Sequence, residues 1–577
     1  MDLENSFDCE LSAPRAYQNL DARSCYSVSS FQYQASSTVM YIDQYISSFE
    51  NFADKNALTC LTTSKTFTYH ALHRLTTKLG NRFRSDGLTK GDVVMVCLFN
   101  TFHLPVAMIG SWKSLGIFSP INFRLAPGEI RIHLEDSNPK VFIFDTDLDD
   151  TIEKALALSR HQPDIIISTQ KSVVKRAIEF DDYLKDASED DPELEDRIRQ
   201  IDPFNDEIER LYTSGTTGFP KGVKFSSHSL LHIALKTIIN NNYTCGDRLM
   251  NLSPWFHQGG LCTAVQPGLL VGAHVFGLKQ FDPDQVLDYV EGHKITFAAG
   301  APTAFNAMEM TQREKRYEVS SLRLIHSSGA PTSSREFLLW KQVFTNHVVN
   351  SYGTTETAST LCLRSDIHPV VEKAGSAGRP FVFVGARVVR FDPEEHTKIE
   401  PDDLARNDGQ EVGQIIARSL GMFDGYHNRP KEEAEKIYKG WFYTGDAATW
   451  DEDGFITVRG RTDDMFVSGG ENIFPQPVEE ALERHRKVRE ALVVGMSDEK
   501  WGQVAVAYIV PAGQVPGAEE LDKHCLEDPD LARYKRPRYY QFVDSLPYTP
   551  TGKKLRYKML ERAAKEKAQF IPVPPKP

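Results

Sequence analysis

The sequence lacks the features that mark several large classes of protein. Its 577 residues carry a formal net charge of −13, so it has no basic excess of the kind that binds nucleic-acid phosphates. Its eight cysteines are scattered and form no CxxC pair, which argues against a zinc ribbon or a dithiol motif and suits a reducing compartment. No internal repeat is visible. With 41% hydrophobic and 25% charged residues, the composition is that of an ordinary globular protein.

Export and membrane signals are also missing. The start, MDLENSFDCE, is acidic and polar, unlike a secretory leader, and the end, IPVPPKP, lacks the Ser-Lys-Leu peroxisomal signal. The most apolar stretch, residues 261–278, contains Gln266, Pro267 and His274, so it predicts a buried helix, a glycine turn and a strand rather than a membrane span. We therefore expect a cytoplasmic protein with no integral membrane segment and no nucleic-acid partner. Its oligomeric state is not predicted.

Short apolar strands alternate with helical patterns from about Tyr41 onward. Apolar residues recur at helical spacing from Leu72 to Phe83, whereas GDVVMVCLF and VFIFD have the pattern of buried strands. The same rhythm returns at KITFAAG and LRLIHSSGA. This alternation predicts an α/β fold whose sheets are mostly parallel and covered by helices.

The pattern changes near Phe391. A charged loop follows, and then EVGQIIARS and GFITVRGR predict antiparallel strands. Further on, the helix PVEEALERHRKV and the strands EALVVGM and VAVAYIV predict a compact α+β unit. Because the chain is too long for one core, we expect at least two domains. The predicted parts are an N-terminal extension at 1–40, a large domain at 41–461 and a small C-terminal domain at 462–577.

A run of glycines and hydroxyl residues, LYTSGTTGFPKG, spans residues 211–222. Backbone N–H groups of a glycine-rich turn form a nest for anions, and Lys221 adds a positive charge that can reach a terminal phosphate. The run is not a Walker motif, because Gly222 rather than Ser or Thr follows the lysine. By composition alone it fits a triphosphate site or a polar surface loop equally well.

The order of the residues in this run decides between the two. YTSGTTGFPKGV closely resembles the phosphate loop of the acyl-adenylate-forming superfamily, the AMP-dependent synthetases and ligases. The resemblance covers about residues 41–560, and the other family motifs follow in the family order. These are SSGAP, NSYGTTETA, FYTGD, GRTDDMFVSGGENIFP and PYTPTGKKLR. The fold that the resemblance implies is a large α/β domain with a small distorted β-barrel, followed by a small mobile α+β domain.

The resemblance also implies roles for residues of these motifs. Tyr352 packs on the adenine, Thr355 touches the region of the α-phosphate, and Glu356 is the magnesium ligand, which suits an ion that prefers oxygen. Asp446 accepts hydrogen bonds from the ribose, and Arg461 lies near ribose and phosphate.

Two further positions follow from the C-terminal motifs. Asp463 matches the family's hinge residue, and the register G-K-x-x-R selects Lys553 over Lys554 as the catalytic lysine. The residues expected to bind ATP are Thr213, Ser214, Gly215, Thr216, Thr217, Gly218, Lys221, Gly329, Ala330, Pro331, Ser351, Tyr352, Gly353, Thr354, Thr355, Asp446, Arg461 and Lys553. The residues expected to take part in catalysis are Lys553, Lys221, Thr355, Glu356 and His257. His228 and His232 have the spacing of metal ligands on a helix, but no third ligand stands near them and we expect no zinc site.

A thiol acceptor is indicated by the segment VSGGEN. In CoA ligases the glycine pair at this position, here Gly469 and Gly470, lines the tunnel for the thin pantetheine arm. The sequence DDMFVSGGENIFP most resembles the aryl- and acyl-CoA ligases. The residues expected to bind CoA are Ser468, Gly469, Gly470, Glu471, Trp501, Tyr534 and Arg536. Packing or a plain surface charge is the alternative for each of the last three.

The sequence says less about which carboxylic acid such an enzyme would activate. His257 matches a position at the mouth of the acyl pocket, and the neighbouring Trp255 and Phe256 suit an apolar acyl or aryl group. Gly259 and Gly260 suggest room for a chain, although core packing explains the aromatic residues equally well. No carboxylate is placed as an anchor for an amino acid, and the chain ends at Pro577 without a carrier domain.

The sequence therefore predicts ATP-dependent activation of a fatty or aromatic carboxylic acid. The acyl-AMP intermediate would pass its acyl group to CoA, with ATP, Mg²⁺ and CoA as cofactor and co-substrates. One alternative is an acyl-AMP ligase that delivers to a carrier protein. The other is an inactive nucleotide-binding relative, which the presence of Lys221, Glu356, Asp446, Arg461 and Lys553 opposes.

Overall fold

The computed structural model describes residues 40–213, 220–330, 332–390, 399–468, 471–498, 501–528, 531–548, 554–566 and 569–573. The predicted N-terminal extension lies outside the described residues, except for Met40. The other expected site residues that lie outside are Ser214, Gly215, Thr216, Thr217, Gly218, Pro331, Gly469, Gly470 and Lys553. The side chain of Glu471 is not described either.

A seven-stranded sheet carries the strand that runs into the predicted phosphate loop. All of its pairings are parallel except the last, between β8 and β9. Strands such as β3 and β5 are apolar and buried throughout, because helices cover both faces of the sheet. In spatial order the strands are β7 (Ala177–Glu179), β6 (Ile165–Ser168), β5 (Val141–Phe144), β3 (Val93–Cys97), β4 (Ile117–Pro120), β8 (Glu207–Thr213) and β9 (Lys221–Ser226).

A second, nine-stranded sheet carries the predicted adenine-binding motifs. Its strands are parallel from β14 to β1, and the three pairings at its two edges are antiparallel. In spatial order they are β16 (Arg379–Pro380), β15 (Ala358–Arg364), β14 (Val348–Thr354), β13 (Leu324–Ser328), β12 (Phe297–Gly300), β10 (Arg248–Asn251), β11 (His274–Gly277), β1 (Asn56–Cys60) and β2 (Lys65–Thr68).

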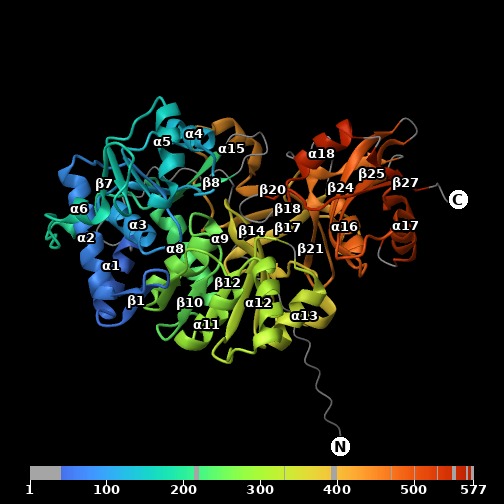
Figure 1. Ribbon diagram of the computed structural model, residues 1–577, viewed down its shortest axis with the longest axis horizontal. Helices are drawn as coiled ribbons and strands as arrows, with labels where there is room; N and C mark the ends of the chain where they lie inside the picture. Colours follow the sequence, from blue (N-terminus) through green and yellow to red (C-terminus); the bar gives the residue numbers. More distant parts are fainter. Residues whose placement is uncertain are drawn as a thin grey trace, which may run out of the picture. The chain divides into compact units, whose positions relative to one another are not determined.

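A layer of helices lies between these two sheets (Figure 1). One hydrophobic core joins Val94 of β3 and Val275 of β11 to the helices, so the layer buries apolar residues of both sheets. Trp112 is fully buried there, and its indole N–H donates to the carbonyl of Ile208 on β8 (3.0 Å). The helices of this layer are α1 (Tyr41–Asn51), α2 (Tyr69–Ser85), α3 (His103–Lys113), α8 (Ser227–Asn241) and α10 (Gln266–Leu270).

Outer helices cover the remaining faces. α4 (Pro127–Ser137) and α5 (Asp149–Leu158) pack on the seven-stranded sheet. α11 (Pro283–His293), α12 (Pro302–Lys315) and α13 (Ser334–Val343) pack on the nine-stranded sheet. The shorter helices are α6 (Phe180–Leu184), α7 (Leu194–Ile198), α9 (Gln258–Gly260), α14 (Val370–Lys373) and α15 (Pro430–Lys436). The predicted α/β architecture is confirmed.

The third sheet is antiparallel and corresponds to the part of the fold predicted as a small distorted β-barrel. Its long central strand, β20, pairs with β18, β19 and β21 along different parts of its length. Among the described strands no pairing closes the sheet into a ring. The strands are β17 (Val384–Arg390), β18 (Gly413–Ser419), β20 (Trp441–Trp450), β19 (Ile437–Tyr438) and β21 (Ile456–Arg461).

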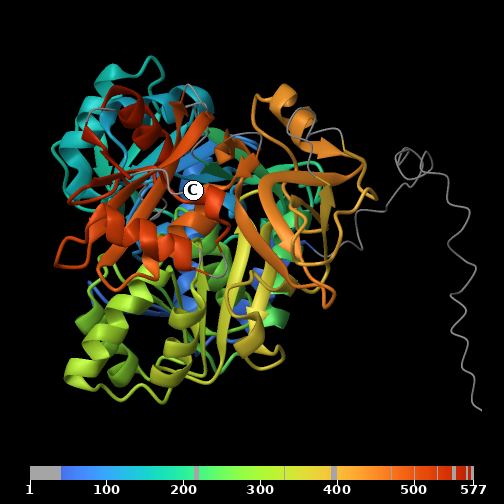
Figure 2. The same cartoon turned by 90° about the vertical axis from the view of Figure 1, so that its right-hand side faces the viewer.

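The fourth sheet contains the last strands of the chain, drawn in orange and red in Figure 2. The helix predicted within residues 477–488 is α16 (Pro475–Glu483), which ends earlier because the next strand begins at Val488. The strands are β23 (Glu471–Ile473), β22 (Phe466–Ser468), β25 (Gly502–Pro511), β26 (Tyr539–Phe542), β27 (Ile571–Pro572) and β24 (Val488–Asp498), which pairs with β25. The accompanying helices are α17 (Ala518–Glu527) and α18 (Arg556–Lys565).

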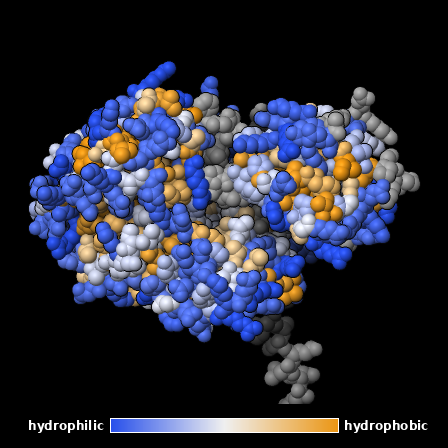
Figure 3. All heavy atoms as spheres, viewed as in Figure 1, coloured by the Kyte–Doolittle hydropathy of each residue, from blue (hydrophilic) through white to orange (hydrophobic). Residues whose placement is uncertain are grey.

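Residues 40–577 form one compact unit, so the limit drawn at 461 stays a prediction. It falls at the end of β21, the last strand of the third sheet, and no described strand pairing crosses it. No helix among the described residues is long and apolar enough to cross a membrane. The apolar stretch 261–278 instead forms a π-helical turn at Leu261–Val265, then α10 and β11, as predicted. On the face shown in Figure 3, apolar side chains occur in separate groups among hydrophilic ones.

A buried carboxyl group lies between the two large sheets. Glu209 on β8 is completely buried, and its Oε2 accepts a hydrogen bond from Gln266 Nε2 of α10 (2.6 Å). Its Oε1 has no hydrogen-bond partner among the described residues. Burial raises the pKa of Glu209 from its usual 4.5 to about 8. The folded protein therefore holds this carboxyl group protonated at neutral pH.

This raised pKa predicts a specific dependence of stability on pH. Between about pH 4.5 and 8 the folded state binds more protons at Glu209 than the unfolded chain does. The free energy of unfolding therefore falls as pH rises through this window, by up to about 1.4 kcal/mol per pH unit. Glu209→Gln keeps a neutral group of the same shape and should remove this pH-dependent loss of stability. The urea midpoint of the variant, relative to that of the unmodified protein, should therefore increase as pH rises.

The control is Glu195→Gln on α7, whose side chain is 75% exposed. It should follow the unmodified protein at every pH. A constant difference in urea midpoint between Glu209→Gln and the unmodified protein from pH 5 to 9 would contradict the assignment of a neutral Glu209.

Candidate active site

The two ends of the phosphate loop are held opposite each other. β8 ends at Thr213 and β9 begins at Lys221, and these two residues are direct partners across the antiparallel pair. Gly222, which breaks the Walker pattern, is required here. A Cβ on it would lie 2.9 Å from Arg210 Cδ and 3.2 Å from His427 Cβ. The strand pairing thus fixes where Lys221 leaves the loop.

Lys221 and Glu356 meet on either side of one tyrosine that sequence reasoning missed. The Lys221 ammonium lies 5.5 Å from the centre of the Tyr426 ring, and the Tyr426 hydroxyl donates to Glu356 Oε1 (2.6 Å). Burial and the charge of Glu356 raise the pKa of Tyr426, which keeps this hydroxyl a donor. A lone aromatic residue in the stretch DGYHNRP carries no sequence signal of this contact.

The carboxylate of Glu356 fits the predicted magnesium ion. Its Oε2 receives no hydrogen bond or ion pair from the described residues, so it is available as an oxygen ligand. Within the described part of the chain no group of three or more His, Cys, Asp or Glu side chains gathers as a metal cage. One carboxylate together with substrate phosphates and water is the arrangement that Mg²⁺ commonly takes in nucleotide sites.

The residues expected to bind adenosine also come together. The Tyr352 hydroxyl on β14 donates to Asp446 Oδ2, and Arg461 Nη1 on β21 donates to Asp446 Oδ1 (3.1 Å) and to the carbonyl of Thr444 (3.0 Å). Asp446 on β20 faces Arg461 directly in the strand register. Burial and the charge of Asp446 raise the pKa of Tyr352. Each oxygen of Asp446 keeps a lone pair, so the carboxylate can still accept from a ribose.

The remaining ATP candidates follow the carboxyl ends of β13 and β14. Gly329 and Ala330 come directly after β13, and Ser351 to Thr354 form the end of the neighbouring β14. In open α/β sheets this edge is where ligands bind. Gly353 is required because a Cβ there would lie 1.9 Å from the carbonyl oxygen of Ala358. Thr355 lies in the turn after β14 and is almost completely buried.

The aromatic residues near the predicted acyl pocket belong mostly to the core. Trp255 is fully buried, and Phe256, at 7% exposure, packs edge-on against Phe123. His257 precedes α9, and its Nδ1 accepts from the backbone N–H of Gly259 (3.2 Å). The core-packing interpretation therefore holds for Trp255, while His257 remains a candidate for the acid side of the site.

One glycine of this region was interpreted wrongly. A Cβ on Gly260 would lie 1.9 Å from the carbonyl oxygen of Pro254, so Gly260 is required by close backbone packing and not by room for a chain. A Cβ on Gly259 would instead lie 3.6 Å from His257 Nδ1 and 3.9 Å from Ser328 Oγ, which are ordinary contacts. Of these two glycines, Gly259 is the one that leaves room for a larger group.

The residues expected to bind CoA separate into two groups. Trp501 and Tyr534 are 42% and 41% exposed. Arg536, in contrast, is 4% exposed, and its Nε donates to Asp522 Oδ1 (2.7 Å), so we remove it from the proposed CoA contacts. Ser468 ends β22, next to the undescribed glycine pair.

A concavity of about 410 Å³ lies beside Trp501. It also involves Arg538, which sequence reasoning missed because nothing in RYKRPR distinguishes one arginine from the other. Its lining residues are Asp498, Trp501, Val504, Arg538, Tyr539, Pro572 and Val573.

The hinge candidate and the lysine pair lie at the two ends of the C-terminal region. Asp463 is 54% exposed in a single 3₁₀ turn, Thr462–Asp464, between the third and fourth sheets. The side chain of Lys554 is held in place by two contacts within the C-terminal region. Its ammonium donates to Glu483 Oε1 (2.7 Å) and to the carbonyl of Ala491 (2.7 Å).

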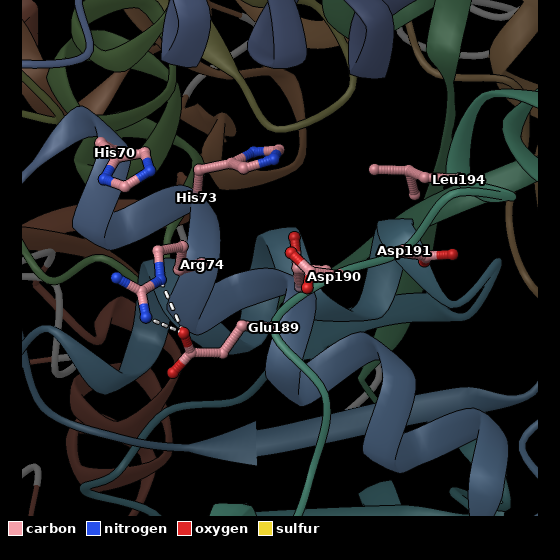
Figure 4. A pocket seen from close by; sticks show the side chains of 8 residues that line it. His70, His73, Arg74, Glu189, Asp190, Asp191 and Leu194 are labelled. Atoms are coloured by element: carbon pink, nitrogen blue, oxygen red, sulfur yellow. Dashed lines mark hydrogen bonds and ion pairs between the residues drawn. The ribbon is translucent and has the colours of Figure 1, made fainter.

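Another concavity, of about 380 Å³, contains none of the predicted site residues (Figure 4). It lies on α2 and the segment before α7, and Arg74 pairs there with Glu189. Its lining residues are His70, His73, Arg74, Thr77, Glu189, Asp190, Asp191 and Leu194. The active-site candidates therefore lie outside this concavity.

Comparison with known proteins decides the family. A family model described as AMP-binding enzyme matches residues 47–427. The chain belongs to the AMP-binding enzyme family. The C-terminal domain of AMP-binding enzymes matches residues 477–553. The resemblance inferred from the motifs is thereby confirmed.

Similar proteins cover most of the chain. A fatty acid–[acyl-carrier-protein] ligase, ScoC, of Streptomyces coeruleorubidus is 30% identical over 505 residues, 86% of this chain and 92% of the relative. A feruloyl-CoA synthase of an Amycolatopsis species is 31% identical over 500 residues, 86% of this chain and 94% of the relative. The solved structure of o-succinylbenzoate CoA synthetase from Bacillus subtilis, in complex with its acyl-adenylate intermediate, is 26% identical with a TM-score of 0.76 and covers 89% of this chain and 97% of its own.

The two neighbouring glycines provide a matched test of this geometry. Gly260→Ala forces a methyl group onto the carbonyl of Pro254 and should destabilise the protein by about 3 kcal/mol or more. Gly259→Ala should fold normally, and a change in KM for the acid would then place Gly259 beside the acyl group. Thermal unfolding measures the first effect and steady-state kinetics the second. Equal Tm values for the two variants would contradict the close contact at Gly260.

Proposed function

We propose that the protein joins a fatty or aromatic carboxylic acid to CoA in two steps driven by ATP. One observation carries the proposal. Lys221, Glu356 and Arg461, which come from three separate segments, each interact electrostatically with the same partly buried side chain, Lys436. Tyr352 and Asp446 adjoin it through Arg461. This is a constellation with a phosphate side and an adenosine side.

The first step is attack on the α-phosphate. A carboxylate oxygen of the acid forms a bond to the α-phosphorus, the bond from that phosphorus to the bridging oxygen breaks, and pyrophosphate leaves. The barrier is repulsion between anions and the growth of negative charge on the leaving group. Lys221 offsets that charge, and Asp446 and Tyr352 hold the nucleoside in place. Glu356 would hold Mg²⁺, and the bound ion would further neutralise the polyphosphate.

Lys553 is proposed to act on the attacking side of this step. Its ammonium pairs with the carboxylate of the acid and an oxygen of the α-phosphate, which brings two anions together. The register of GKKLR supports this choice.

The second step transfers the acyl group to a thiol. The sulfur attacks the acyl carbon, the bond from that carbon to the phosphate oxygen breaks, the thiol proton passes to water, and AMP leaves. We propose that pantetheine passes Gly469 and Gly470. The CoA nucleotide then lies in the concavity beside Trp501, where an indole can stack on adenine and Arg538 can bind phosphate.

A change of domain orientation belongs to the same proposal. Lys553 and Gly470 both lie in the C-terminal region, yet they serve successive steps. The region must therefore present one and then the other, and Asp463, half-exposed in a single turn between two sheets, is the proposed hinge.

A carrier protein is the alternative acceptor. The similarity to ScoC, named as a fatty acid–carrier protein ligase, favours it. The similarity to feruloyl-CoA synthase favours CoA.

A panel of fatty and aromatic acids tests the function and the acceptor together. Purified protein with ATP and Mg²⁺ should release pyrophosphate only when a suitable acid is present, and adding CoA should convert that acid to its thioester. A matched reaction contains a phosphopantetheinylated carrier protein in place of CoA. Thioester on the carrier but none on CoA would favour the alternative, and no acid-dependent pyrophosphate from any acid would reject the function.

The adjacent lysines should give opposite results. Lys553→Ala should slow adenylation by about 10²–10³-fold, the usual cost of removing one donor aimed at a transition state. It should spare the reaction of pre-formed acyl-AMP with CoA. Lys554→Ala should keep the adenylation rate but unfold more easily, by about 1 kcal/mol, because it loses the bonds to Glu483 and Ala491.

Two measurements separate these outcomes. Pyrophosphate release reports adenylation, and urea unfolding reports stability. The assignment fails if Lys554→Ala is the variant with crippled adenylation, or if Lys553→Ala slows thioester formation from acyl-AMP just as severely.

A further inference from the structure

A third cation lies in the active site that neither the motifs nor their spacing predicted. Lys436 is the last residue of α15, which packs against β19 and β20 (Figure 1). Its Nζ lies 3.4 Å from the point that a Cβ on Gly445 would occupy, and Arg461 Nη2 lies 2.9 Å from the same point. Lys436 and Arg461 therefore flank the backbone immediately before Asp446.

The ammonium of Lys436 is partly buried without a direct partner. It makes no hydrogen bond or ion pair within 4 Å with any described residue, although it comes from a helix with three glutamates, Glu432, Glu433 and Glu435. The ionisable groups that act on it are Arg461, Lys221, Asp463 and Glu356. Burial and the charge of Arg461 lower the pKa of Lys436.

The charge around Lys436 suits an anion. Lys436, Arg461 and Lys221 are three cations, against which stand Asp463, half-exposed, and Glu356, whose free oxygen suits magnesium. Charges of like sign gathered in a partly buried site repel one another unless an anion lies among them. A phosphate group that carries negative charge and several acceptor oxygens satisfies all three cations at once.

We propose that Lys436 binds the α-phosphate of ATP and of the acyl-AMP, next to Arg461. The proposal rests on the function proposed above and adds a phosphate-binding residue to it. Lys436 precedes the hinge candidate Asp463, whereas Lys553 follows it. Lys436 therefore stays with the nucleotide through both steps, and its loss should weaken both, unlike the loss of Lys553.

A plain structural role is the competing explanation, because a lysine at the end of a helix also interacts favourably with the helix dipole.

Binding of AMP, ATP and adenosine to the full-length protein, measured by calorimetry, separates the two roles. Lys436→Met keeps the apolar stem and removes the charge. We expect its Kd for AMP and ATP to rise about 10–100-fold, the cost of one lost hydrogen bond to a charged group. Its Kd for adenosine, which lacks phosphate, should not change.

The control is Lys431→Met, an exposed lysine of the same helix, which should bind all three compounds normally. Lys436→Arg should restore most of the AMP affinity, and it replaces Lys436→Met if that variant does not fold. In that case Lys436→Arg is compared with Lys436→Gln, and Lys436→Arg should bind AMP about 10–100-fold more tightly.

Unchanged AMP and ATP binding in Lys436→Met would overturn the proposal. Equal weakening of adenosine would also overturn it, because that result reports distortion of the nucleoside site. If the unmodified protein binds neither ATP nor AMP, the proposed function itself fails and this assignment fails with it. Normal binding by the unmodified protein confines any failure to Lys436.

Discussion

The ion pair between Asp446 and Arg461 is the contact on which the rest of the site depends. It joins two neighbouring strands of the third sheet, and Tyr352 ties it to the end of β14 in the nine-stranded sheet. The next residues after Arg461 form the turn that leads to the fourth sheet. One carboxylate therefore connects the proposed adenosine side of the site with the strand that leads to the proposed hinge. Its position is set by strand register, which is rigid, and not by a loop.

The same strands that build the core also aim the functional side chains. β8 carries the buried Glu209 in its middle and reaches the phosphate loop at Thr213. Trp112 packs against this strand from the helical layer between the two large sheets and bonds to its backbone. The same strand pairs with β9, which begins at Lys221. Stability and catalysis share these elements, so variants of the core need a binding measurement beside a stability measurement.

Much of this arrangement was predictable from the sequence. The alternation of strands and helices predicted the parallel sheets, and the family resemblance carried by the short motifs implied that Tyr352, Asp446 and Arg461 lie around one nucleoside. Motifs of this kind can be recognised in a sequence because the backbone conformation and the ligand together restrict the residue type at several neighbouring positions. The failures concern residues whose role depends on packing and pairing that the residue type alone does not reveal.

Particular residues show why. Arg536 has the residue type of a phosphate ligand, but Asp522 neutralises it in the interior. Gly260 is small because the carbonyl of Pro254 approaches it, and Lys554 is held by Glu483. Tyr426 and Lys436 enter the site only through tertiary packing, since neither belongs to a motif that spacing alone reveals. Sequence spacing specifies neighbours within one segment, whereas burial and charge pairing are set by the whole fold.

The central claim is that the acid becomes joined to the α-phosphate of ATP in this site. The most direct measurement follows oxygen. When the acid carries ¹⁸O in its carboxylate, attack on the α-phosphorus transfers one labelled oxygen to the nucleotide, and thiolysis at the acyl carbon leaves it there. Mass spectrometry of the products should therefore find AMP with one ¹⁸O atom and unlabelled pyrophosphate. Label in inorganic phosphate with formation of ADP, or AMP without label, would contradict the account.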